Sequence, residues 1–142
     1  MSDTVKWHDR YSVGFEEMDA DHKHLLSLIQ EASALSKLDV NDEEVIKKFK
    51  VVLDQLVAYT KSHFQREEKL MRDNGFPDLE RHQGIHQDLV ENLRGMQQEF
   101  KASGPKVFSK LVVFLSTWWN SHILGTDQEY AAYLADKKNN VG

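Results

Sequence analysis

The sequence contains no cysteine among its 142 residues. Disulfides, thiolate metal sites, iron–sulfur clusters and cysteine nucleophiles are therefore excluded. A transition metal bound by this chain must rely on histidine, carboxylate, tyrosine or water.

Long apolar runs are also absent. The most apolar stretch, residues 107–119, is broken by two serines, a lysine and a threonine, so nothing approaches the roughly 18 apolar residues that a membrane span requires. The first residues show no basic segment followed by an apolar one, the pattern of a signal peptide. These two observations favour a cytoplasmic protein without a membrane span.

The chain has no excess of positive charge. Eighteen Lys and Arg residues against 23 Asp and Glu give a formal net charge of −5, which argues against nucleic acid as a partner. A hydrophobic content of 40 % is typical of a globular protein. At this length we expect one domain over residues 1–142.

Neither internal repeats nor strand-like alternation of apolar residues is present. Instead, four amphipathic segments with apolar residues at steps of three and four predict helices. They span residues 19–38, 43–72, 79–102 and 106–135. Because the breaks between them are short, the sequence predicts an all-α fold, an antiparallel up-down-up-down four-helix bundle.

Polar residues mark the ends of these helices. Asp19 or Asp21 can cap the first helix, Asn41 or Asp42 the second, and Asp78 the third. Residues 1–18 form an N-terminal arm whose four spread apolar and aromatic side chains are expected to hold it to the bundle. The polar tail from Asp136 onward is expected to fray.

Histidines recur on the predicted inward faces. His63 and Glu67 lie four residues apart, as do His82 and His86, which places each pair on one helix face, one turn apart. His22 shares the apolar face of the first helix, whereas His24 is rotated by about 200° and should lie at the surface.

The fourth helix adds His122 and Asp127 to this set. A buried carboxylate is costly unless it is paired or binds a metal. Five imidazoles and two carboxylates are too many ligands for one tetrahedral zinc ion, whereas bridging carboxylates favour a centre with two iron or manganese ions.

The whole pattern resembles a bacterial hemerythrin. The resemblance rests on these motifs, in chain order: Trp7-x3-Tyr11-x-Val13-Gly14, Met18-Asp-x-Asp-His22, His63-x3-Glu67, His82-x3-His86 and Trp118-x3-His122-x4-Asp127. It implies a non-haem di-iron centre and reversible binding of dioxygen, without enzymatic turnover. One iron would be held by His82, His86 and His122, and the other, with an open coordination position, by His22 and His63.

The resemblance also implies the remaining parts of the centre. Glu67 and Asp127 would bridge the two irons, together with an oxo or hydroxo group. An apolar pocket for dioxygen would be lined by Leu25, Phe64, Trp118 and Ile123, for which ordinary core packing is an equal alternative. Tyr130 is a candidate hydrogen-bond partner near the bridge, and Tyr11 a weaker one.

Asp127 does not follow from helical spacing. It lies five residues after His122, which on a straight α-helix leaves it about 140° away from the histidine's face. We expect a local distortion, or an effect of Gly125, to bring the carboxylate round.

The leading functional prediction is an oxygen carrier, store or supplier to a partner enzyme that uses oxygen, with a monomer favoured. The alternatives are a module that senses oxygen or nitric oxide, a di-iron peroxidase or nitric-oxide-consuming enzyme, and a metal-buffering protein. A short polar tail without an attached signalling region weighs against the sensor. The ratio of five imidazoles to two carboxylates weighs against the enzyme, since oxygen-activating di-iron bundles are richer in carboxylates.

Overall fold

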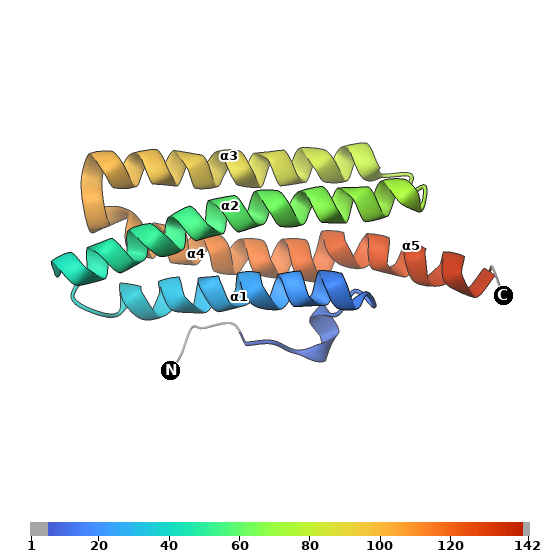
Figure 1. The fold of residues 1–142 in the computed structure, drawn as a ribbon, viewed down its shortest axis with the longest axis horizontal. Coiled ribbons are helices and arrows are strands. Elements are labelled where there is room, and N and C mark those ends of the chain that lie inside the picture. The colour runs from blue at the N-terminus through green and yellow to red at the C-terminus, as the bar shows by residue number, and fades with distance from the viewer. Residues whose placement is uncertain (1–5, 141–142) are drawn as a thin grey trace.

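The computed structural model describes residues 6–140 and has the predicted all-α architecture (Figure 1). Three long helices, α1 (Glu16–Ser36), α2 (Glu43–Asp73) and α3 (Leu79–Ser103), run antiparallel to their neighbours in the chain. A fourth rod is continuous but composite, formed by α4 (Phe108–Trp118), the π-helix η3 (Trp119–Thr126) and α5 (Asp127–Asn140). Helix α1 packs against both α2 and α4, and α2 packs against α3.

The first helix begins three residues earlier than predicted, and neither expected cap was correct. Its N-cap is Phe15, which makes no side-chain cap bond. Asp19 instead accepts hydrogen bonds from the Ser12 hydroxyl (2.6 Å) and the Val13 backbone (2.9 Å). Its carboxylate therefore ties the N-terminal arm, which contains the short 3-10 helix η1 (Asp9–Tyr11), to α1.

The next two helices begin where the sequence predicts. Asp42 caps α2 by accepting from the backbone of Glu44 (2.8 Å) and Val45 (3.3 Å). Asp78 is the N-cap of α3, although its side chain makes no cap bond. Between α2 and α3, Gly75 has φ +68°, a conformation that favours glycine and suits the predicted Asn-Gly turn.

The fourth predicted helix, 106–135, differs most from the structure. A 3-10 turn, η2 (Gly104–Val107), precedes it, a π-helical stretch interrupts it, and it continues to Asn140. The helix therefore extends past residue 135, where the sequence predicted its end, and the expected fraying of the tail stays a prediction. Residues 141–142, like residues 1–5 of the arm, lie outside the described part of the chain.

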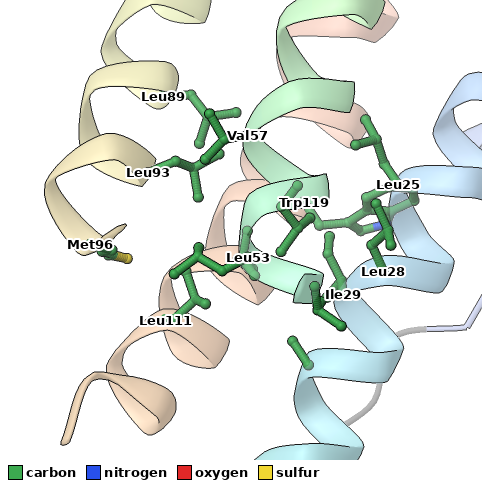
Figure 2. Packing of buried hydrophobic residues seen from close by; sticks show 14 of the residues in the cluster. Leu25, Leu28, Ile29, Leu53, Val57, Leu89, Leu93, Met96, Leu111 and Trp119 are labelled. Carbon is green, nitrogen blue, oxygen red and sulfur yellow. The ribbon is translucent and has the colours of Figure 1, made fainter. Parts of the chain in front are cut away.

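Two apolar clusters fill the bundle. The larger contains the side chains drawn in Figure 2 and includes Phe49, which stacks on Phe108 with ring centroids 3.6 Å apart. The smaller contains Met71, Phe76 and Tyr130 near the opposite end. Helix α1 passes from Met18 in the smaller cluster to Leu25 in the larger one. The polar residues between these positions, and their counterparts on the other helices, are thus enclosed on both sides by apolar packing.

Within residues 6–140, none of the helices has the combination of length and apolar character needed to cross a membrane.

Candidate metal centre

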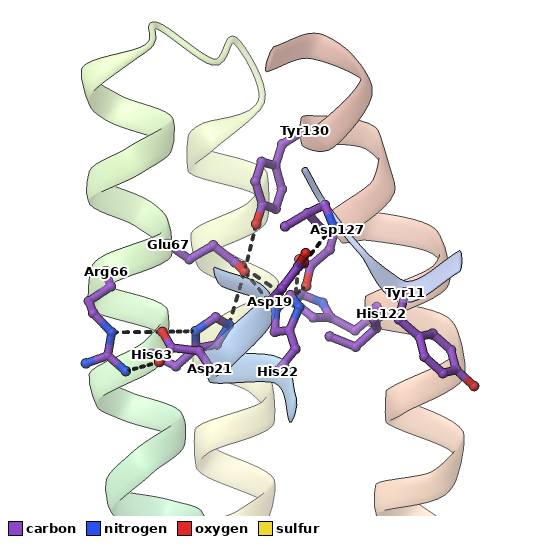
Figure 3. Close-up of polar contacts among 12 residues, drawn as sticks. Tyr11, Asp19, Asp21, His22, His63, Arg66, Glu67, His122, Asp127 and Tyr130 are labelled. Atoms are coloured by element: carbon purple, nitrogen blue, oxygen red, sulfur yellow. Dashed lines mark hydrogen bonds and ion pairs between the residues drawn. The ribbon is translucent and has the colours of Figure 1, made fainter. Parts of the chain in front are cut away.

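The four helical rods of the bundle each contribute polar side chains to one buried cluster between the two apolar clusters. Figure 3 labels members of this cluster from α1, α2 and the composite fourth rod, among them Glu67 and Asp127. All seven predicted ligands are present there, and none is more than 2 % exposed. They are His22 from α1, His63 and Glu67 from α2, His82 and His86 from α3, His122 from η3 and Asp127 from α5. His24, predicted to lie at the surface, is exposed.

The π-helix explains how Asp127 joins the cluster. In a π-helix the backbone bonds link residues five apart, and here the Asp127 N–H donates to the His122 carbonyl oxygen. Residues five apart therefore lie about one turn apart. The predicted local distortion is confirmed, but Gly125 is not needed sterically, because a Cβ atom built there meets nothing within 4 Å.

Glu67 stands between two groups of histidines. Its Oε2 lies 3.3 Å from His22 Nε2 and 3.1 Å from His63 Nε2. Its Oε1 lies 3.2 Å from His82 Nε2 and 3.0 Å from His86 Nε2. One carboxylate thus has a separate oxygen for each group.

Asp127 makes a second connection between the same groups. Its Oδ1 lies 3.0 Å from the Nε2 atoms of both His82 and His122, and its Oδ2 lies 3.3 Å from His22 Nε2. The histidines therefore divide into a pair, His22 and His63, and a triplet, His82, His86 and His122. Two potential metal-binding groups, one around each set, share Glu67.

This donor set fits two transition-metal ions. Every histidine directs Nε2 inward, and His86 and His122 bring these nitrogens within 3.2 Å of each other. His63 Nε2 and Asp127 Oδ2 are buried without a hydrogen bond of suitable geometry among the described residues. Buried polar atoms are normally satisfied, so these two atoms are available as metal ligands. Imidazole and carboxylate donors suit iron among other metals.

The electrostatics of the clustered side chains agree with this interpretation. Burial alone lowers the pKa of His22, but Asp127 and Glu67 outweigh it and raise that pKa to about 10. The same balance raises the pKa of His82 to about 9. Burial raises the pKa of Glu67, but the charge of His63 and hydrogen bonds from the histidines hold that pKa well below its usual value. Protons on the imidazoles thus occupy the place that metal cations would take.

Two of the histidines have carboxylate partners on their other ring nitrogen. His63 Nδ1 lies 2.8 Å from Asp21 Oδ2, and His86 Nδ1 lies 2.8 Å from Glu68 Oε2. From the sequence, Asp21 was considered only as a helix cap, and Glu68 was not identified as a partner of a histidine. Histidine ligands commonly donate their second N–H to a carboxylate. Which carboxylates lie at these positions depends on how the helices pack. Only the position of Glu68, directly after Glu67, could have indicated one of them.

Tyr130 is the hydrogen-bond partner that the family resemblance implied. Its hydroxyl donates to Glu67 Oε2 at 3.1 Å, and burial beside that carboxylate raises the pKa of Tyr130 well above its usual value. Tyr11, the weaker candidate, has a different position. Its ring packs edge-on against Trp119, with centroids 5.3 Å apart, and its hydroxyl points away from the carboxylates in Figure 3.

Aromatic side chains surround the cluster. Of the four proposed pocket residues, Leu25, Phe64 and Ile123 are buried and Trp118 is half-buried. Phe64 stacks on His86 at a centroid distance of 3.6 Å, and Trp118 stacks on His122 at 5.1 Å. Trp119, which the sequence did not single out, is fully buried, and its ring centroid lies 6.4 Å from that of His22.

Comparison with known proteins identifies relatives over most of the chain. The bacteriohemerythrin of Stenotrophomonas maltophilia is 28 % identical over 129 residues, covering 88 % of this chain and 78 % of that protein. The myohemerythrin of Theromyzon tessulatum is 29 % identical over 129 residues, covering 91 % and 92 %. The bacteriohemerythrin of Pseudomonas paraeruginosa is 31 % identical over 124 residues, covering 87 % and 77 %.

The family model described as the hemerythrin HHE cation binding domain matches residues 13–134. That range includes all seven clustered histidines and carboxylates. The chain therefore belongs to the hemerythrin family.

Proposed function

We propose that this protein binds dioxygen reversibly at a non-haem di-iron centre, as an oxygen carrier, store or supplier. The observation that carries the proposal is the division of the histidines into a pair and a triplet by two carboxylates. Glu67 and Asp127 each contact members of both sets, the arrangement that two bridged ions require. The relatives named bacteriohemerythrin and myohemerythrin support the same function.

The ligand roles follow from that division. His22 and His63 would hold one iron, and His82, His86 and His122 the other, with Glu67, Asp127 and an oxo or hydroxo group as bridges. When bound, the two irons supply the electrons for reversible binding of dioxygen.

The chain's own residues adapt the site to this task. Complete burial of Glu67 and Asp127 excludes bulk water, and the Tyr130 hydroxyl holds Glu67 in place. Leu25, Phe64, Trp118 and Ile123 supply apolar surface suited to an uncharged diatomic ligand.

The donor set also supports binding in preference to turnover. Oxygen-activating di-iron bundles use more carboxylate ligands, whereas five neutral imidazoles with two carboxylates stabilise highly oxidised iron poorly. Oxidation of an added organic substrate by the reduced, iron-loaded protein in air would contradict this part of the proposal. A cytoplasmic location, a monomeric state and an oxygen-using partner enzyme stay predictions.

An optical titration of the reduced, iron-loaded protein with dioxygen tests the function. We expect a charge-transfer band that appears with dioxygen and disappears on degassing. Immediate, irreversible oxidation would indicate sensing or catalysis instead.

Variants test the ligand assignment in the same assay. Asp127→Ala should lose iron and the oxygen-dependent band, because it removes one bridge. His24→Ala, at an exposed position on α1 close to His22, should keep both. If Asp127→Ala retained two irons and normal oxygen binding, the assignment of Asp127 would be wrong.

A further inference from the structure

Asp21 is the centre of a hydrogen-bond network outside the ligand cluster. This carboxylate on α1 accepts from four donors on α2, and its side chain is only 9 % exposed. The donors are His63 Nδ1 (2.8 Å), the Tyr59 hydroxyl (2.6 Å), and Arg66 Nε and Nη2 (2.8 Å each). Figure 3 shows Arg66 and His63 on opposite sides of Asp21.

The bond to Asp21 determines which way the His63 ring faces. With Nδ1–H donated to Asp21, the Nε2 atom faces Glu67 at 3.1 Å with its lone pair available to a metal. His22 has no such support, because its buried Nδ1 lacks a hydrogen-bond partner among the described residues. Asp21 therefore supports one of the two histidines in the pair.

The triplet also has a histidine bonded to a carboxylate, but no arginine within residues 6–140 offsets the charge of that carboxylate. His86 Nδ1 is bonded to Glu68, which lies at the edge of a cavity of about 260 Å³ between α2 and α3. Among the side chains that the structure describes, no Lys or Arg forms an ion pair with Glu68. Asp21, in contrast, is bound by two nitrogens of Arg66, which offset its negative charge.

We propose that Asp21 is a positioning residue that sets the metal affinity and reduction potential of the ion held by His22 and His63, and that Arg66 moderates its effect. This inference rests on the proposed di-iron function and assigns a role within it. An anion bonded to Nδ1–H makes the imidazole a stronger electron donor, which stabilises the more oxidised ion. A cation bound to that anion reduces the electron donation by the imidazole and therefore reduces the stabilisation of the oxidised ion.

Two substitutions should therefore act in opposite directions. Asp21→Asn keeps an acceptor for the His63 N–H but removes the charge, so the reduction potential should rise. Arg66→Gln keeps a donor for Asp21 but removes the opposing charge, so the potential should fall. A role in folding alone would not give effects of opposite sign.

The first measurements use the metal-free protein and zinc. Ring NMR of the wild type should show a hydrogen-bonded Nδ1–H of His63, and this signal should shift in Asp21→Asn. Calorimetric titration with zinc should show that Asp21→Asn binds one of two ions roughly 10- to 100-fold more weakly. Glu68→Gln is the matched control, which should leave the His63 signal unchanged and weaken the other ion.

Spectroelectrochemistry of the iron-loaded variants completes the test. We expect opposite shifts for Asp21→Asn and Arg66→Gln, and a double variant that matches Asp21→Asn, since Arg66 acts through Asp21. Shifts of the same sign, or a normal potential together with normal zinc affinity in Asp21→Asn, would overturn the proposal. Because zinc binding and ring NMR need no dioxygen, a missing oxygen-dependent band would count against the proposed function alone. If Asp21→Asn does not fold, Arg66→Gln alone decides by the sign of its shift.

Discussion

The backbone N–H of Asp127 donates to the carbonyl oxygen of His122, five residues earlier, and this bond places both side chains in one buried cluster. On an uninterrupted α-helix the two residues would point in widely different directions. The extra residue of the π-helix is thus a structural requirement of the site, in keeping with the frequent occurrence of such distortions at functional positions.

Inserting one alanine after Gly125 should rotate everything after it by about 100° relative to His122, because the π-helix already accommodates one extra residue. Asp127 would leave the cluster, and the Tyr130 hydroxyl would leave Glu67. We expect fewer than two metal ions per chain, measured by elemental analysis. The control is Gly125→Ala, whose added Cβ meets nothing within 4 Å; it should keep both ions and be more stable by about 0.5–1 kcal/mol in thermal unfolding. Full metal content in the insertion variant would refute the requirement for the five-residue spacing of His122 and Asp127.

Tyr130→Phe should distinguish the contribution of the Tyr130 hydroxyl from that of its ring packing. The ring stays in the smaller apolar cluster, while the bond to Glu67 is lost. A buried acceptor loses one of its donors, so the free energy of unfolding of the metal-free protein should fall by about 1 kcal/mol. Two ions should still bind, with a shifted absorption band in the iron-loaded state. An unchanged stability and spectrum would show that the hydroxyl does not act on Glu67.

The metal-free protein should become less stable as pH rises above neutrality. The pKa of His22 is raised to about 10 and that of His82 to about 9 by the two carboxylates, against about 6.5 in the unfolded chain. A raised pKa stabilises the fold fully below about pH 6.5, and the contribution is lost as pH rises through the folded value.

Melting temperatures from pH 6.5 to 10 test this expectation, measured with a chelator for the metal-free protein and without one for the zinc-loaded protein. The metal-free protein should show a steady decrease, whereas the zinc-loaded protein should show little change over the same range because metal replaces the protons. A metal-free melting temperature that stays level or rises with pH would contradict the proposed charge balance.

Gln128 should hold the N-terminal arm to the end of the π-helix. Its amide nitrogen lies 3.3 Å from the Ile123 carbonyl oxygen and 3.3 Å from those of Arg10 and Ser12. Gln128→Ala should speed proteolysis of the arm and cost about 1 kcal/mol of stability. Glu129→Gln, which removes only an exposed ion pair with Arg81, should be close to neutral. Equal rates of proteolysis of the arm in the two variants would show that Gln128 does not hold the arm in place.

Periodicity alone predicted the parts of the molecule that depend on position along one helix. It separated His22 from His24 and placed His63, Glu67, His82 and His86 on inward faces. It failed where the chain departs from 3.6 residues per turn, so Asp127 was supported by family resemblance and not by geometry. It also missed Asp21 and Arg66, because their contact joins two helices whose relative rotation and height are determined only by packing.

Trp118 and Trp119 are neighbours in the sequence, yet their rings contact histidines of different groups. Trp118 stacks on His122, and Trp119 meets His22 edge-on. Bound iron quenches nearby indole fluorescence by energy transfer, so the two tryptophans are natural optical reporters, one beside each proposed ion. Their emission allows the order in which the two positions fill to be followed in the unlabelled protein, with Trp118→Phe and Trp119→Phe separating the signals.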